Sequence, residues 1–186
     1  MTLYEVIIKM SELSLFFNEL EKKSKNLKRK IFLIRSLKSL LAYSVSILKD
    51  FTASKEINGK FILTSSKYQN KTITFILQRE FAEIVLRRTL IFMAWSFFED
   101  FFQKETKTKK IGRELLKGYF GEANKIPTII NYFYGIRNSI HSNGIYHGKK
   151  LICKIGSDNY ELKDNQKVIL EYLPILNIIK ESLNLL

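Results

Sequence analysis

The sequence contains a single cysteine, Cys153, among its 186 residues. No disulfide can form within the chain, which excludes the disulfide-rich frameworks of small secreted domains. A thiol catalyst would have to use Cys153, but no base stands beside it in sequence, so we interpret it as a small buried side chain. A chain of this length buries roughly 70% of the surface that its unfolded form exposes, so it can fold without disulfides or a structural metal.

Proline, glycine and histidine are scarce as well, with two, eight and two residues. No glycine-rich phosphate loop and no dinucleotide-binding fingerprint appears in the sequence. The two histidines, His141 and His147, could build a zinc site with the one cysteine only if a further ligand came from elsewhere. We therefore expect no metal and no cofactor.

Long hydrophobic runs are also missing. The longest uncharged stretches, 89–98 and 126–136, reach about half of the ~20 residues that a membrane-spanning helix needs. The first nine residues carry Glu5, whereas a secretory signal would place basic residues there. These features predict a cytoplasmic protein that does not enter a membrane.

Charge is strongly one-sided, because 31 Lys and Arg stand against 18 Asp and Glu and give a net charge of +13. Such an excess favours a polyanionic partner, most often nucleic acid. Part of it lies in two clusters, 22–30 and 104–110. Both fall between apolar segments, so each is equally well interpreted as a solvated loop between helices.

Apolar residues recur at spacings of three and four along most of the chain, which indicates amphipathic helices. The segment 90–98 is apolar almost all round and predicts a helix that is buried centrally or against a second subunit. The segment 57–68 fits either a short extended stretch or a loop. We predict helices over the ranges 4–22, 31–51, 72–103, 111–120, 127–142 and from a cap at Asp164 or Asn165 to Leu185.

Glycine and proline mark the ends of these segments. Gly121 ends one helix, Pro127 suits the first turn of the next, and Asn143-Gly144 stops it. Pro174 should kink or restart the last helix. Two alternating runs, 151–155 and 160–163, flank a four-residue turn and predict a β-hairpin.

The fold class that we expect is mainly α, as one domain over residues 1–186. It is a bundle of four to five helices with a small β-hairpin before the last helix. Whether residues 1–70 belong to the bundle or form a separate cap stays open.

Arg137 and His141 are four residues apart and therefore share one face of their predicted helix. The arginine fork matches a phosphate, and histidine moves protons near neutral pH. Together they can cleave RNA without metal. The imidazole can take the proton of the ribose 2′-hydroxyl or give a proton to the leaving oxygen, while the guanidinium holds the phosphate. Asn138 can add a neutral donor. Basic residues also favour a helix C-terminus electrostatically, which is the alternative interpretation.

The segment Arg137-Asn138-x-x-His141, late in a helix and followed by a glycine, resembles the signature of the HEPN superfamily of small, all-helical, usually dimeric proteins. The resemblance covers about 72–186, where an apolar helix with Glu99 precedes the motif helix and a closing helix. It implies a metal-independent ribonuclease, often a toxin or an antiviral effector, with a composite site across a homodimer. Carried over, Arg137 and His141 are catalytic, and Asn138 and Glu99 are accessory.

Only three residues separate Arg137 from His141, fewer than in the usual HEPN pattern. Relatives that lack the active pattern serve as binding or dimerisation modules. The alternative is thus a non-catalytic HEPN-like module that binds nucleotide, RNA or a partner protein such as an antitoxin. A purely structural helical subunit is a third possibility. His147 lies beyond Gly144 and ranks below His141 as a proton carrier.

Overall fold

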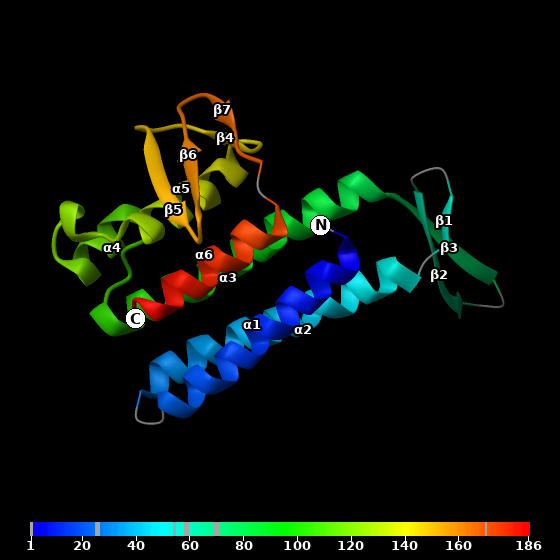
Figure 1. Cartoon of the computed structure of the whole chain (residues 1–186), viewed down its shortest axis with the longest axis horizontal. Helices are drawn as coiled ribbons and strands as arrows, with labels where there is room; N and C mark the ends of the chain where they lie inside the picture. The colour runs from blue at the N-terminus through cyan, green and yellow to red at the C-terminus, as the bar shows by residue number, and fades with distance from the viewer. Residues whose placement is uncertain (1, 25–26, 54, 58–59, 69–70, 170) are drawn as a thin grey trace.

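A computed structural model describes residues 2–24, 27–53, 55–57, 60–68, 71–169 and 171–186, with side chains described outside 51–81. Helices dominate it (Figure 1). The prediction of a mainly helical chain with a small hairpin before the last helix is confirmed, although the described residues form six α-helices instead of four or five. In chain order the elements are α1 (Leu3–Lys23), α2 (Lys28–Ala53), β1 (Lys55–Ile57), β2 (Lys60–Tyr68), β3 (Lys71–Gln78), α3 (Arg79–Thr106), α4 (Gly112–Phe120), the 3-10 turn η1 (Ala123–Lys125), α5 (Thr128–His141), β4 (Ile145–Tyr146), β5 (Leu151–Ile155), β6 (Asp158–Leu162), β7 (Gln166–Lys167) and α6 (Tyr172–Asn184).

The first two helices lie side by side and pack on the rest of the bundle (Figure 1). A capping box starts α1: the Glu5 N–H donates to Thr2 Oγ1 at 3.2 Å, and the Thr2 N–H donates to the Glu5 carboxylate at 2.7 Å. Both bonds satisfy N–H groups that a helix N-terminus leaves without partners. Met10 and Phe17 of α1 are fully buried in the same apolar cluster as the later helices. The N-terminal helices thus share one core with the motif helix.

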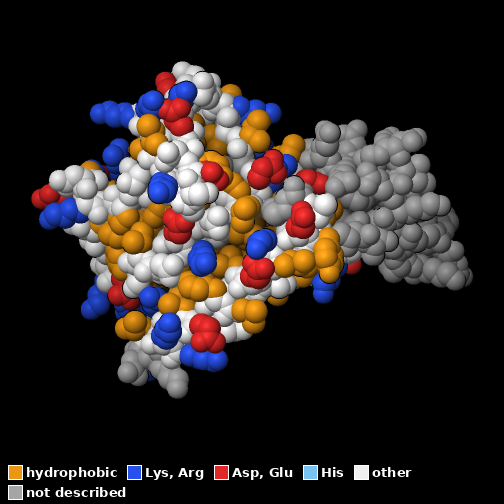
Figure 2. All heavy atoms as spheres, in the orientation of Figure 1, with side chains coloured by type: hydrophobic (Ala, Val, Ile, Leu, Met, Phe, Trp, Pro, Cys, Tyr) orange, Lys and Arg blue, Asp and Glu red, His pale blue; other side chains and the backbone are white. Residues whose placement is uncertain are grey.

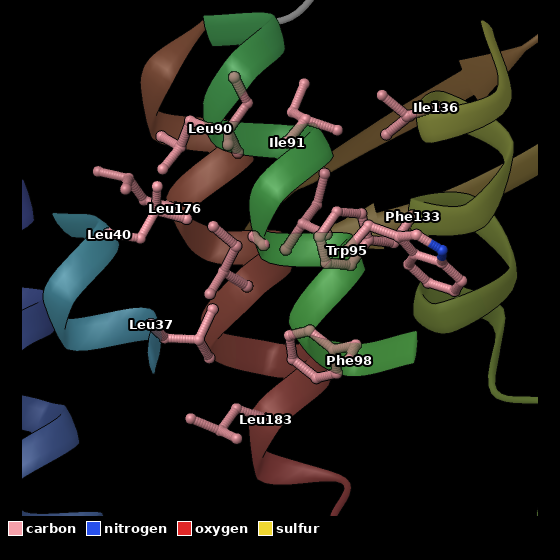
Figure 3. Packing of buried hydrophobic residues seen from close by; sticks show 14 of the residues in the cluster. Leu37, Leu40, Leu90, Ile91, Trp95, Phe98, Phe133, Ile136, Leu176 and Leu183 are labelled. Atoms are coloured by element: carbon pink, nitrogen blue, oxygen red, sulfur yellow. The ribbon is translucent and has the colours of Figure 1, made fainter. Parts of the chain in front are cut away.

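Helix α3 lies at the centre of that core (Figure 3). Its Trp95 is completely buried and packs edge-on against Phe133 of α5, with ring centroids 5.2 Å apart. Side chains of α2, α5 and α6 surround α3, as the labelled residues Leu37, Leu40, Leu90, Ile91, Trp95, Phe98, Phe133, Ile136, Leu176 and Leu183 show (Figure 3). Central burial within one chain accounts for most of the all-round apolar character of 90–98.

The prediction of one continuous helix over 72–103 is wrong at its start. Residues 71–78 form β3, which pairs antiparallel with β2, and β2 pairs with β1. Half of the segment is β-branched (Thr72, Ile73, Thr74 and Ile76), which favours a strand once a neighbour supplies the backbone hydrogen bonds. The segment 57–68 fitted either an extended stretch or a loop. From Lys60 onward it forms the strand β2. This three-stranded sheet stands at the end of the α2–α3 pair (Figure 1).

The predicted hairpin is present, but its turn has two residues instead of four. β5 and β6 pair in register up to Ile155 and Asp158, and Gly156 and Ser157 form the turn. Gly156 has a φ of +63°, the left-handed value that tight hairpin turns require and glycine adopts without strain. Because the turn is shorter than expected, β6 begins two residues earlier than the alternation suggested.

The last helix starts at Tyr172, so the prediction of a cap at Asp164 or Asn165 is wrong. The intervening chain forms β7, which pairs with β4, and Asp164 accepts a hydrogen bond from the Gly148 N–H at 3.1 Å. Pro174 consequently lies in the first turn of α6, where its missing N–H removes no helical hydrogen bond.

One helix in the described part of the chain, over Lys28–Asp50 in α2, is long and apolar enough to cross a membrane, with a mean hydropathy of 1.6. A core helix passes the same test, and α2 buries Leu37 and Leu48 in the bundle. The feature therefore does not decide where the protein is located.

Burial raises the pKa of the Cys153 thiol to about 11. An unfolded thiol ionises near pH 8.5, so the folded state binds the proton more tightly. Stability is therefore full below about pH 8.5 and falls as pH rises through the window between the two pKa values. We expect the midpoint of urea unfolding to stay constant between about pH 7 and 8 and to fall between about pH 9 and 11.

The matched control is Cys153→Ala, measured over the same pH range. Burial also raises the pKa values of Tyr132 and Tyr172, so a loss of stability at higher pH remains in the variant. The difference between the two proteins isolates the thiol. Identical pH slopes in wild type and variant would contradict the assignment.

Candidate functional site

The C-terminal end of α5, which carries the motif, is fixed by its local backbone. The helix stops as predicted at Asn143 and Gly144, whose φ values are +56° and +86°. The Gly144 N–H donates to the Ser139 carbonyl at 2.7 Å, which closes the helix end. A Cβ on Gly144 would stand 2.8 Å from Nη2 of Arg88 in α3. The left-handed backbone favours glycine at this position, and a larger residue would also have to displace the Arg88 guanidinium.

The C-terminal β-hairpin packs on the side of α5 that lies away from the motif. A Cβ added to Gly135 would meet Leu162 Cδ1 at 2.9 Å and the Tyr146 ring at 3.1 Å, so the hairpin approaches the bare helix backbone. Gly135 and Arg137 are two residues apart, which is roughly 200° around a helix. The hairpin therefore leaves the Arg137 side of α5 to α3 and to solvent.

Arg137 and His141 meet at one residue of α3, Phe92. The Arg137 Cζ lies 5.8 Å from the centre of the Phe92 ring, and the His141 ring lies edge-on at 5.7 Å. A guanidinium at this distance is attracted to the ring face. His141 is exposed, and the Arg137 side chain keeps 24% of its surface accessible. The two groups of the sequence motif are thus neighbours at the surface.

Asn138 and Glu99 hold the guanidinium of Arg137. Arg137 Nη1 donates to the Asn138 side-chain oxygen at 3.0 Å, and Nη2 lies 3.9 Å from the Glu99 carboxylate. The other Glu99 oxygen accepts the backbone N–H of Gly112, at the start of α4, at 3.0 Å. The Arg137 Nε is buried without a hydrogen-bond partner in the described part of the chain. The structure therefore brings all four predicted site residues together around one guanidinium and one aromatic ring.

Phe92 and Arg88 are site residues that the sequence analysis missed. Arg88 lies one helical turn before Phe92 on α3, and its Nη2 donates to the Asn143 carbonyl at 3.3 Å. It adds a cation beside the motif and ties the end of α5 to α3. The i, i+4 spacing of Arg88 and Phe92 is visible in the sequence, but nothing local indicates that this face meets α5.

A cavity of about 160 Å³ lies next to the motif, between α3, the end of α5 and the segment after β7. It is smaller than the roughly 300–1,000 Å³ of typical ligand pockets, so it can admit only a part of a ligand. Arg87, which borders it, is paired with Glu171 at 2.9 Å. The lining residues are Ile84, Arg87, Arg88, Ile91, Ile136, Ser139, Ile140, Gly144, Lys167, Val168 and Ile169.

The other candidate residues lie outside this arrangement. His147 follows β4 and has Asp164 as its neighbour, with Nδ1 4.0 Å from the carboxylate. Cys153 is buried in β5, as the sequence indicated. Within the residues that the structure describes, no three His, Cys, Asp or Glu side chains gather where they could hold a metal ion.

Comparisons with protein-family models, with curated proteins and with solved structures found no match to this chain. A guanidinium held in place beside an exposed imidazole can bind a phosphate and transfer a proton next to it. Asn138 and Glu99 touch the guanidinium, so they orient it and need not contact a substrate.

Proposed function

We propose that the chain is a metal-independent, HEPN-type ribonuclease that cleaves RNA through Arg137 and His141 as a toxin or an antiviral defence effector. The observation that carries the proposal is the shared position of both side chains on Phe92. A guanidinium, which can bind a phosphate, thus has an imidazole beside it, which can transfer a proton. The net charge of +13 supports a polyanionic substrate.

In the proposed reaction, neutral His141 takes the proton of a ribose 2′-hydroxyl. The 2′-oxygen then attacks the adjacent phosphorus, and the bond from phosphorus to the 5′-oxygen breaks. Arg137 contacts the non-bridging oxygens and stabilises their charge as it builds up. The products are a 2′,3′-cyclic phosphate and a 5′-hydroxyl, whose oxygen needs a proton from a second acid.

A homodimer would supply that acid. Of the two histidines, only His141 contacts Phe92, whereas His147 neighbours Asp164. Two motif helices that meet across a dimer would place a second imidazole opposite the first, one as base and one as acid. The need for this second acid supports the dimer, whereas most of the apolar run in α3 is already buried within one chain.

The test is incubation of purified protein with structured RNA in excess EDTA. We expect cleavage that leaves 2′,3′-cyclic phosphate ends, because no step uses a metal. Light scattering at micromolar protein should give twice the mass of one chain. Intact RNA after incubation with a dimeric protein of normal circular dichroism would contradict the ribonuclease.

The alternative function is a non-catalytic module that binds nucleotide, RNA or a partner protein. The short Arg137–His141 spacing favours it, and so does the carboxylate of Glu99, which offsets part of the charge that a phosphate would meet. This module would bind RNA with a strong dependence on salt and leave it intact, because phosphate contacts release counterions. Absence of RNA binding at low salt would leave the partner-protein role.

A further inference from the structure

The two basic clusters of the sequence meet at one end of the bundle. The start of α2 lies beside the C-terminal end of α3. Arg29 Nη1 donates to the Lys104 carbonyl at 2.7 Å and lies 3.3 Å from the Glu105 carboxylate. Arg29 and Lys104, which are 75 residues apart in the sequence, therefore belong to one continuous surface.

We call this surface the basic end, and it carries an excess of positive charge. Its carboxylates already have partners: Glu19 pairs with Lys22, Asp100 with Lys104, and Glu105 with Arg29. In Figure 2, blue side chains lie, with red ones among them, at the end of the molecule where α1 ends and α2 begins. The nine described cations of the basic end are Lys22, Lys23, Lys28, Arg29, Lys30, Lys104, Lys107, Lys109 and Lys110.

Aromatic rings lie among these cations. Phe32 is 57% exposed, and the Lys104 ammonium stands 4.7 Å from its ring centre. Two hollows of about 160 and 430 Å³ share Lys28, Arg29 and Phe101, and the larger one also has Tyr119 in its wall. Cations that follow a backbone and aromatic faces that stack bases are the two components of single-strand binding surfaces.

The loop between α3 and α4 joins the basic end to the candidate site. It begins with Lys107, and it leads to Gly112, whose N–H is bound by Glu99 beside Arg137. Along α3, twelve residues separate Phe92 from Lys104, which is about 18 Å at 1.5 Å per residue. A strand stacked at about 3.4 Å per nucleotide covers that distance with roughly five nucleotides.

We propose that the basic end binds the backbone and bases of single-stranded RNA that continues from the segment held at Arg137 and His141. The proposal rests on the proposed function for the position of the cleaved phosphate, but binding at the basic end requires no cleavage. A stacked strand shorter than about five nucleotides would not reach both surfaces.

The experiment compares two triple variants that lose the same charge. The test variant is Lys107→Gln/Lys109→Gln/Lys110→Gln. The control changes three exposed lysines of the C-terminal hairpin region, Lys149, Lys154 and Lys163, to Gln. Fluorescence anisotropy measures binding of a 2′-O-methyl 20-nucleotide RNA, which attack by the 2′-oxygen cannot cleave, over a range of salt concentrations.

For the test variant we expect at least tenfold weaker binding at low salt. The slope of log K against log salt should become shallower by about 2, because three phosphate contacts on a single strand contribute about 0.7 each. The control should stay within about twofold of wild type. Equal losses in both variants, or none in either, would overturn the proposal. Binding of polyglutamate as tight as that of RNA, and equally sensitive to the test substitutions, would overturn the assignment to RNA.

These measurements distinguish a failure of the proposed ribonuclease from a failure of the proposed RNA binding at the basic end. If wild type binds the RNA through the basic end but cleaves no unmodified RNA, the ribonuclease fails and this inference stands. If wild type cleaves and the test variant binds like the control, this inference alone fails. Cleavage of a dinucleotide should be equal in wild type and test variant, because such a substrate reaches only Arg137 and His141.

Discussion

His141→Ala is expected to lower the rate of RNA cleavage by about 10²–10⁴-fold, the usual contribution of a general acid or base. The side chain is exposed and its ring contact in the structure is with Phe92, so its removal should cost little stability. The expected effect is therefore on kcat and not on folding. Initial rates in EDTA, with circular dichroism to confirm the fold, measure it.

The chain offers a matched control in its other histidine. His147 is also exposed and neighbours Asp164 at 4.0 Å, so His147→Ala should leave the rate within about twofold of wild type. A His141→Ala protein that cleaves as fast as wild type would refute the catalytic assignment. Equal losses in both variants would point to a general loss of charge or fold.

Trp95→Ala is expected to lower the free energy of unfolding by about 3–5 kcal/mol, the range for removing a buried large aromatic side chain. Trp95 is completely buried, with ring centroids 5.2 Å from Phe133 and 5.5 Å from Tyr134. The lost ring would leave a cavity between α3 and α5. Since whole domains are stable by about 5–15 kcal/mol, this one change removes a large share.

Trp95→Phe is the control for that prediction. It keeps an aromatic ring against Phe133 and removes the buried Nε1, which has no hydrogen-bond partner in the described part of the chain. Loss of an unpaired donor offsets some of the lost packing, so the cost should be well below that of Trp95→Ala. Urea unfolding followed by circular dichroism measures both variants, because neither keeps the tryptophan fluorescence. A cost of Trp95→Ala below about 1 kcal/mol would contradict the packing described for α3.

Periodicity located the helices because each buries one face, and the spacing of Leu37, Leu40 and Leu41 reports that burial directly. The same method failed at 71–78, where apolar residues fit either a helix or a strand. Pairing with the adjacent β2 decided that case, because a short apolar run does not show by its periodicity alone whether it is a helix or a strand. The start of α6 was misplaced for the same reason, since β7 pairs with β4.

The site residues, too, could be predicted from the sequence only in part. Arg137, Asn138 and His141 could be proposed together because they lie within five residues of one helix, which fixes their relative positions. The role of Glu99 was predicted only from the order of helices in the HEPN resemblance. In the structure its carboxylate lies 3.9 Å from Nη2 of Arg137. Phe92 and Arg88 required knowledge of how α3 faces α5. Contacts across a helix interface depend on the packing of the whole core, which the sequence of one helix does not specify.

The contacts that hold α5 have a consequence for the energy of substrate binding. Arg88 ties the carbonyl of Asn143 to α3 after the helix ends, and Glu99 links the Arg137 guanidinium to the first residue of α4. With its end clamped in this way, the motif helix has little freedom to shift when a phosphate arrives. The reorganisation needed for recognition is then confined to side-chain rotation of Arg137 and His141. Groups that are oriented in advance lose less entropy on binding and stabilise developing charge more effectively.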